Sequence, residues 1–364
     1  MSVGPWILKW RAAKRIEVSY VKVKKILVVG GGSIGKRHVR VARQLRPDAQ
    51  IMVLTMHPGM NLPEGATGYL SSMDQALAYE ADVAVIANAS TAHVDSANLL
   101  LAGTVHLLLE KPISDTAQGV EALIARCKER NLNIMVGYNL RYSESLQAMR
   151  QAIREGEIGQ VLSVRAEVGQ YLPQWRADVD YRATVSARSE LGGGVLLELS
   201  HEIDYLLWMF GDVEWIQAYC GRHSALEIDV EDIAHILMRF DTDGPAKGAV
   251  ASIVMDFFRK DPRRNCCVIG SEGTLIWDAM AGLVIINKGS TSQPRQIFQR
   301  QAMPDDTYVA EWRQFLAKVE GGTADQTDAR GALKVVRIIE AAKQSTDQGL
   351  RMHKLDAECT RWRW

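Results

Sequence analysis

The sequence lacks an excess of either charge, a long apolar run and any internal repeat. Lysine plus arginine and aspartate plus glutamate each number 43, so the charge balance gives no support to a nucleic acid or a membrane surface as partner. No apolar run approaches the roughly 20 residues that a membrane-spanning helix needs. We therefore expect neither a nucleic-acid partner nor a membrane.

Cysteine is also scarce, at five in 364 residues. The cysteines form no C-x-x-C pair and show no zinc-ligand spacing, so we expect reduced thiols, no bound metal and a cytoplasmic location. They are Cys127, Cys220, Cys266, Cys267 and Cys359.

The length is too great for one ordinary core, which predicts two domains. Residues 1–23 form an N-terminal extension in which Trp6, Ile7, Leu8 and Trp10 lie among basic residues. This apolar stretch is too short for a signal peptide, and no small-residue cleavage site follows it. A short amphipathic helix, a non-native extension and a disordered arm all fit the composition.

The stretch 25–38, KILVVGGGSIGKRH, carries the strongest local motif. An apolar strand is followed by Gly30, Gly32 and Gly35 in G-x-G-x-x-G spacing, and then by a basic, helix-compatible segment. The first glycine allows a tight turn, the second lets the backbone approach a pyrophosphate, and the third lets the helix pack closely. The helix N-terminus adds free N–H groups and the positive end of its dipole. The motif predicts NAD or NADP binding, with the pyrophosphate over Gly32, Ser33 and Ile34.

The choice between the two cofactors stays open. An acid about 20 residues beyond such a motif normally receives the adenosine ribose hydroxyls. Thr55 stands at that position, and no carboxylate lies nearby. One interpretation is relaxed or NADP-leaning specificity, with Arg37 or His57 at a 2′-phosphate; the other is NAD held by different contacts.

Further apolar runs predict four more parallel strands, at 51–54, 81–87, 105–109 and from 134. Ligands bind at the carboxyl ends of such strands. The residues placed there are Asn88 to His93 after the second of these runs and Glu110-Lys111-Pro112 after the third. Lys111 is therefore a candidate reactive-site cation.

Beyond Val161 the pattern changes to consecutive strand-like runs, which indicate an antiparallel sheet. A stretch within this region, GGGVLLELSHEIDYLLWMFG at 192–211, predicts one amphipathic helix. Glu198, His201 and Tyr205 share its polar face, and Asp204 follows His201 by three residues. The residues 305–320 and 328–346 predict two closing helices.

The Asn88 to His93 turn, Glu110-Lys111-Pro112 and the segment 138–142, YNLRY, occur in an order that resembles the Gfo/Idh/MocA family, which includes glucose–fructose oxidoreductase and inositol dehydrogenases. The resemblance covers roughly residues 24–354. It implies a Rossmann domain at 24–142, a doubly wound parallel sheet, and an α+β domain at 143–354 with a large open, mostly antiparallel sheet. The closing helices, 305–346, would pack back on the first domain. The family's use of one sheet face for subunit contact implies a homodimer or homotetramer.

The resemblance also assigns roles to residues. Family members carry a glycine triplet, an acid and then His-x-x-Asp, which His201 and Asp204 match. The family's acid is an aspartate four residues before the histidine, whereas Glu198 stands three residues before His201. The implied cofactor-binding residues outside the glycine motif are Arg37, Thr55, Asn88, Ser90, Thr91, His93, Glu110, Lys111 and Asn139.

The implied activity is NAD(P)-dependent oxidation of a secondary alcohol of a sugar, cyclitol or nucleotide-sugar derivative, or the reverse reduction. His201, with a pKa near neutrality, would act as general base, and Lys111, before a cis Pro112, would stabilise the developing alkoxide. Glu198 and Asp204 would orient or polarise His201. The implied substrate-binding residues are Lys111, Tyr138, Arg141 and His201.

Two alternatives remain. A cofactor- or sugar-sensing protein of the same fold needs no turnover, but the presence of both Lys111 and His201 argues against it. An enzyme of the same fold can also act on a non-sugar ring, because fold alone does not define a substrate.

Overall fold

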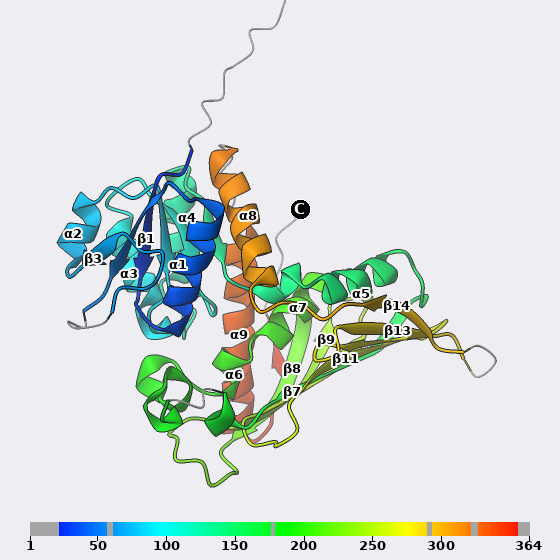
Figure 1. The fold of residues 1–364 in the computed structure, drawn as a ribbon. Helices are drawn as coiled ribbons and strands as arrows, with labels where there is room; N and C mark the ends of the chain where they lie inside the picture. The colour runs from blue at the N-terminus through cyan, green and yellow to red at the C-terminus, as the bar shows by residue number, and fades with distance from the viewer. Residues whose placement is uncertain (1–21, 57–60, 176–178, 290–292, 322–326, 356–364) are drawn as a thin grey trace, which may run out of the picture.

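The computed structural model describes residues 22–56, 61–175, 179–289, 293–321 and 327–355 (Figure 1). Apart from Lys22 and Val23, the N-terminal extension lies outside these residues, as does His57. Two sheets organise the described chain, one in each half of the molecule (Figure 1).

The first sheet has six strands, all parallel, in the order β3-β2-β1-β4-β5-β6. Residues of β4 are buried on both faces, which explains why its sequence, VAVI, has no polar alternation. The strands are β1 Lys25–Val29, β2 Gln50–Leu54, β3 Gly68–Leu70, β4 Val83–Ile86, β5 His106–Leu109 and β6 Ile134–Val136. The order is that of a doubly wound dinucleotide-binding sheet.

Helices cover both faces of this sheet. On one face, α1 (Ser33–Leu45) and α8 (Asp306–Glu320) share a core with β1, in which Trp312 and Phe315 of α8 are fully buried. On the other face lie α2 (Met73–Ala78), α3 (His93–Leu100) and α4 (Val120–Glu129). Figure 1 shows α8 beside α1, so a helix from the end of the sequence completes the first layer.

The second sheet has nine strands in the order β14-β13-β12-β11-β7-β10-β9-β8-β15. Among the described strands of this sheet, β7 and β10 pair in parallel and the other neighbours are antiparallel. The strands are β7 Val161–Gly169, β8 Val213–Gly221, β9 Ile233–Phe240, β10 Val250–Asp256, β11 Arg263–Gly270, β12 Thr274–Asp278, β13 Leu283–Asn287, β14 Arg295–Gln299 and β15 His353–Lys354. Together the two sheets confirm the predicted fold class.

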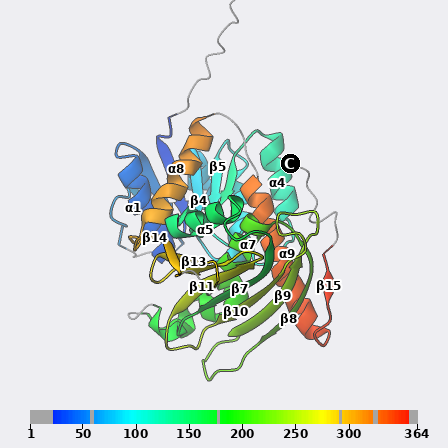
Figure 2. The same ribbon diagram turned by 90° about the vertical axis from the view of Figure 1, so that its right-hand side faces the viewer.

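One face of the second sheet packs against helices, and the other does not. Along β9, Ala234, Ile236, Met238 and Phe240 are buried while the residues between them are more exposed. Figure 2 shows α5, α7 and α9 on the same side of the sheet. Their bounds are α5 Glu144–Arg154, α7 His201–Phe210 and α9 Thr327–Asp347. Helix α9 contacts both β6 and β8 and so lies between the two domains.

The single helix predicted for 195–211 is wrong. The segment forms α6, Val195–Glu198, and then α7, with a turn at Leu199 and Ser200. The polar face predicted for this helix is also wrong, because two of its three residues are buried: Tyr205 fully, and His201 to 9% exposure. Most of helix α7 is buried because it is packed between the second sheet, α9 and the segment η2, Asn139–Tyr142.

Among the described residues, no helix combines the length and the apolar character needed to cross a membrane.

Candidate active site

The glycine motif has the geometry of a phosphate-binding turn. Gly30 has a φ of 106°, and a Cβ there would lie 2.6 Å from the carbonyl oxygen of Ala87. A Cβ on Gly35 would overlap the carbonyl oxygen of Gly30, whereas one on Gly32 would meet open space. Helix α1 begins at Ser33 with no side-chain cap and no acid in its first turn. Its N–H groups are thus available to an anion over Gly32, Ser33 and Ile34.

Thr55 and Arg37, the candidates for the adenosine end of the cofactor, contact different elements. Thr55 follows β2, and its amide donates to the carbonyl of Leu70 over 3.1 Å. Arg37 lies 3.2 Å from the carboxylate of Asp305, and its guanidinium covers the ring of Tyr308 at 4.8 Å. The side chain of Arg37 is therefore held against the N-terminal end of α8.

The buried histidine His93 holds the turn after β4 in place. The two ring nitrogens of His93 lie 2.9 Å from the carbonyl oxygen of Pro112 and 3.1 Å from that of Asn88. Burial lowers the pKa of His93, and a neutral ring donates to only one of these carbonyls. Asn88 donates to Ser96, while its Oδ1 has no partner among the described residues. His93 therefore ties this turn to the Lys111–Pro112 segment.

A second buried chain of hydrogen bonds holds the residue before Lys111. The indole N–H of Trp312 donates to Nδ1 of His38 over 2.9 Å, and Nε2 of His38 lies 2.7 Å from the carboxylate of Glu110. Because an indole can only donate, His38 carries its proton on Nε2 and donates it to Glu110. Burial alone would raise the pKa of Glu110, but His38 and Lys111 outweigh it and lower the pKa. The other carboxylate oxygen accepts the amide of Lys111 at 3.1 Å.

Lys111 crosses from the first domain to the second. The Lys111–Pro112 bond is cis, which confirms the prediction for this bond. The ammonium donates to the carbonyl oxygen of Glu198 over 2.7 Å. Lys111 thus reaches the turn that separates α6 from α7, three residues before His201.

His201 begins α7 and is 9% exposed. Its Nδ1 is enclosed and has no hydrogen-bond partner among the described residues, and its ring packs edge-on against Tyr138 at 5.5 Å. Burial, followed by the cations Lys111 and Arg264, lowers the pKa of His201 well below 6.5. The pKa near neutrality that the sequence predicted is therefore wrong, and the imidazole is neutral at physiological pH.

The acids expected beside His201 contact other groups. Asp204 accepts two hydrogen bonds from Arg141, of 2.9 and 2.6 Å, and Arg141 also lies 3.2 Å from Asp328 of α9. The carboxylate of Glu198 accepts from Ser186 over 2.8 Å. Asp204 and Arg141 thus join α7 to η2 and α9. Asn139, also in η2, donates to Thr307 over 2.9 Å.

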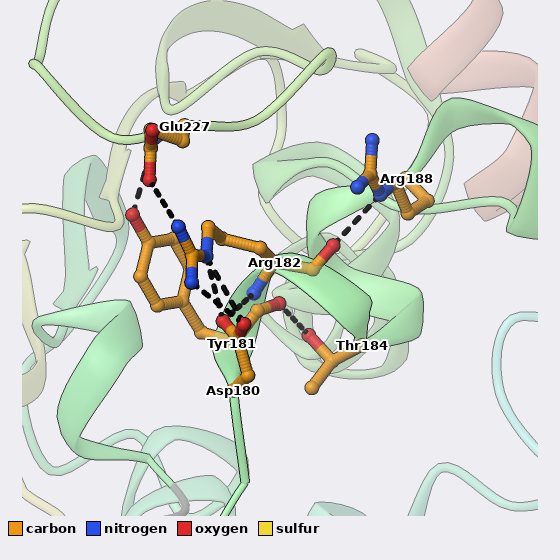
Figure 3. A network of polar contacts seen from close by, with 6 residues as sticks. All are labelled: Asp180, Tyr181, Arg182, Thr184, Arg188 and Glu227. Atoms are coloured by element: carbon orange, nitrogen blue, oxygen red, sulfur yellow. Dashed lines mark hydrogen bonds and ion pairs between the residues drawn. The ribbon is translucent and has the colours of Figure 1, made fainter.

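The segment 180–194 contacts the turn after β4. Ser90 and Thr91 donate to the carbonyl oxygens of Gly192 and Glu190 over 3.4 Å each. The segment also carries Ser186, the partner of Glu198. Figure 3 shows the polar contacts of this segment, with Asp180, Tyr181, Arg182, Thr184, Arg188 and Glu227 drawn. Arg182 pairs with Asp180 within the segment and with Glu227 in the loop before β9.

Two residues near His201, Glu202 and Arg264, were not predicted from the sequence. Glu202 is fully buried, and Arg264 of β11 lies 2.9 Å from its carboxylate. Glu202 was not predicted because it belongs to neither the apolar nor the polar face that the sequence predicts for this helix. The alternation of β11 places Arg264 on the same side as buried Cys266. A charged residue at an inward-facing position of the strand was the one feature of the sequence that could have indicated it.

In the part of the chain that the structure describes, no cluster of His, Cys, Asp and Glu residues is suited to a metal ion. The site instead combines a dinucleotide-binding turn with a lysine and a neutral histidine supplied by different domains. This combination is typical of nicotinamide-dependent oxidoreductases.

Two family models match the chain and extend this assignment. Residues 24–138 match the model described as "Oxidoreductase family, NAD-binding Rossmann fold", and residues 146–276 match the GFO/IDH/MocA C-terminal domain. Together they cover more than half of the sequence. The chain therefore belongs to the Gfo/Idh/MocA family of oxidoreductases, which confirms the resemblance.

Individual relatives are sugar dehydrogenases and reductases by name. The chain is 25% identical to D-apiose dehydrogenase of Paraburkholderia graminis, over 93% of this chain and 92% of the relative. It is 28% identical to 1,5-anhydro-D-fructose reductase of Ensifer adhaerens, over 54% of this chain but only 57% of the relative.

Solved structures of similar fold contain the cofactor. Levoglucosan dehydrogenase in complex with NADH superposes with a TM-score of 0.80 at 19% identity, covering 92% of this chain and 99% of that one. GenD2 from gentamicin A biosynthesis, in complex with NAD, superposes with a TM-score of 0.76 at 25% identity, covering 96% and 100%. The residues of this chain fit such a cofactor, since the space over Gly32 is open, α1 has an uncapped N-terminus and Asn88 keeps an unpartnered oxygen.

Proposed function

We propose that the protein catalyses reversible oxidation of a secondary alcohol in a sugar, a cyclitol or a nucleotide-sugar derivative. One observation supports the proposal: Lys111, from the carboxyl end of β5, donates to the carbonyl of Glu198, three residues before His201 at the start of α7. Ligands of doubly wound sheets bind at the carboxyl ends of the strands.

His201 and Lys111 have different roles in the proposed reaction. His201 takes the hydroxyl proton; Nε2 is the atom for this transfer, because Nδ1 is enclosed by protein. Lys111 stabilises the charge that develops on the substrate oxygen. The bound nicotinamide supplies the hydride chemistry. Tyr138 packs on the His201 ring and limits its rotation, and the Arg141–Asp204 pair holds α7 in place.

NAD is the cofactor that we propose over NADP. Arg37 pairs with Asp305 and stacks on Tyr308, so a 2′-phosphate would have to displace these contacts. Calorimetry with both cofactors tests the choice, with tighter binding of NAD expected. If neither bound to the folded protein, the proposed function would be overturned.

A panel of free sugars, inositols and nucleotide sugars, read by the absorbance of reduced nicotinamide, tests the activity itself. Turnover of at least one class is expected. Cofactor binding with no turnover across the panel would favour the sensing protein.

We also propose assembly through the open face of the second sheet, as a homodimer or homotetramer. Tyr219 of β8, Leu237 of β9 and Ile276 of β12 point to this face and are 39, 39 and 42% exposed. Apolar faces of this kind are seldom left bare. Light scattering at micromolar concentration tests assembly, and a monomer would contradict it. A cytoplasmic location fits the free thiols of Cys127, Cys220, Cys266 and Cys267.

A further inference from the structure

Arg264 lies on the inner face of the second sheet, at the end nearest the candidate catalytic residues. Along β11, Arg264, Cys266 and Val268 share the face that packs against α7, whereas Arg263 points to the opposite face. The side chain of Arg264 is 23% exposed, and its Nε lies 2.9 Å from Glu202 Oε1. The guanidinium is thus held beside the residue that follows His201.

The contact with Glu202 is an ion pair between Nε, at one edge of the guanidinium, and Oε1 of the carboxylate. The two terminal nitrogens, Nη1 and Nη2, have no partner among the described residues and are not enclosed. A pair of parallel N–H donors therefore remains available at the site.

The charge of Arg264 acts on the candidate catalytic base. After burial, the two groups that lower the pKa of His201 are Lys111 and Arg264, both cations. The same two cations oppose the burial that raises the pKa of Glu202. The contacts agree with this: Arg264 pairs with Glu202, the residue after His201, and Lys111 donates to the carbonyl of Glu198, three residues before it. A neutral sugar hydroxyl between Lys111 and His201 would leave the Arg264 donors unused.

We propose that the substrate is a sugar acid, whose carboxylate accepts two hydrogen bonds from Nη1 and Nη2 of Arg264 while its alcohol lies between Lys111 and His201. The planar fork of an arginine matches a carboxylate in geometry and charge. Glu202, next to the fork, disfavours a doubly charged phosphate and leaves a single carboxylate as the better match. This inference rests on the proposed function and narrows its substrate class.

Matched substrates test the proposal: glucose against glucuronate, and galactose against galacturonate, with NAD and the full-length protein. The acid of the preferred pair should have a kcat/KM at least on the order of 10² higher than its neutral partner, as expected for hydrogen bonds to charged groups. Arg264→Met should remove this preference, mainly by raising KM for the acid. Arg264→Lys should restore part of it, since lysine keeps the charge but not the fork.

Two further variants make the outcome interpretable. Arg263→Met is the matched control, because the neighbouring side chain is 51% exposed on the opposite face and should leave the preference unchanged. Glu202→Gln combined with Arg264→Met removes both charges, in case Arg264→Met alone leaves a buried carboxylate that prevents folding.

The proposal and the proposed function fail in different ways. Turnover of neutral sugars with equal or lower activity on the acids, unchanged in Arg264→Met, would overturn the proposal and keep the function. If no compound is turned over, calorimetry of glucuronate and galacturonate with the NAD-loaded protein decides. Binding that Arg264→Met abolishes supports the carboxylate site although the function has failed, and absent or unchanged binding overturns it.

Discussion

The ammonium of Lys111 takes the place of a backbone amide at the carbonyl oxygen of Glu198, 87 residues further along the chain. In an uninterrupted helix that carbonyl would accept the N–H of Glu202. Here the N–H of Glu202 points instead to the carbonyl of Leu199, at 3.3 Å. The break between α6 and α7 therefore coincides with the contact that joins the two domains, and it puts His201 at the first position of α7.

Lys111→Ala should lower turnover by on the order of 10² or more, because it removes the cation that stabilises the developing alkoxide. Steady-state kinetics with the preferred substrate measures this loss, and calorimetry should find cofactor affinity little changed. Lys288→Ala is a suitable control, since that side chain is 47% exposed and pairs with Glu157, far from the candidate site. An equal loss in both variants would point to a general effect of charge.

The pH profile should show an active base well below neutrality. Because burial and two cations lower the pKa of His201 well below 6.5, kcat/KM for oxidation should stay level as the pH falls through 6.5 and decline only further down. In Lys111→Met the decline should move to higher pH, since one of the cations has gone. A wild-type profile that declines near neutral pH would contradict the assignment.

The lowered pKa of His201 also makes the stability of the fold depend on pH. The unfolded chain binds a proton at His201 below about pH 6.5, the ordinary histidine value, while the folded chain resists it, so His201 makes the free energy of unfolding fall as the pH drops below that value. Urea denaturation of wild type and His201→Asn at pH 7.5 and 5.5 should show the smaller loss in the variant.

The glycine motif gives a pair of matched substitutions. Gly35→Ala places a Cβ on the carbonyl oxygen of Gly30 and should destabilise the fold by roughly 1–3 kcal/mol, the usual cost of overpacking. Gly32→Ala meets open space in the protein and should leave stability unchanged while weakening NAD binding. Urea denaturation and calorimetry measure the two effects. Equal NAD affinity in wild type and Gly32→Ala would place the pyrophosphate elsewhere.

Glu311 of α8 is a fully buried carboxyl with no hydrogen-bond partner among the described residues. Burial, reinforced by Glu110 and Asp328, raises its pKa well above 4.5. The folded state therefore holds the proton more tightly, and stability falls as the pH rises above 4.5. Glu311→Gln should be more stable than wild type by about 1–3 kcal/mol at pH 8 and equal to it below pH 4.5. Exposed Glu129→Gln is the control, and a pH-independent difference for Glu311→Gln would contradict the argument.

Much of the first domain was predictable because its strands are continuous apolar runs and its turns require glycine at particular positions. Gly30 and Gly35 occupy positions where a Cβ has no room, and such positions leave a sequence pattern. Strand β3 was missed because three partly buried residues, Gly68 to Leu70, carry no periodicity. The break at Leu199 was missed because no proline or glycine marks it; a side chain from another domain stabilises it.

The chemistry of the site was less predictable than its location. His201 and Lys111 could be named from spacing and resemblance, but the partners of the nearby acids depend on packing between segments far apart in sequence. Asp204 accepts from Arg141, and Glu198 accepts from Ser186. Among the residues that the structure describes, no hydrogen bond therefore supports the prediction that either carboxylate orients His201. Arg264 comes from a strand whose pairing order the sequence does not specify, although its inward position follows from alternation once the strand is known.

The most direct test of the central claim, that Lys111 and His201 act together on one hydroxyl, is the turnover of His201→Ala alone and combined with Lys111→Ala. His201→Ala should lower kcat by roughly 10² to 10⁴, as expected for a positioned base. The double variant should lose less than the product of the single losses, because both groups serve the same transition state. NAD affinity, measured by calorimetry on the same proteins, should stay close to that of wild type. Near-normal turnover in His201→Ala would contradict the account.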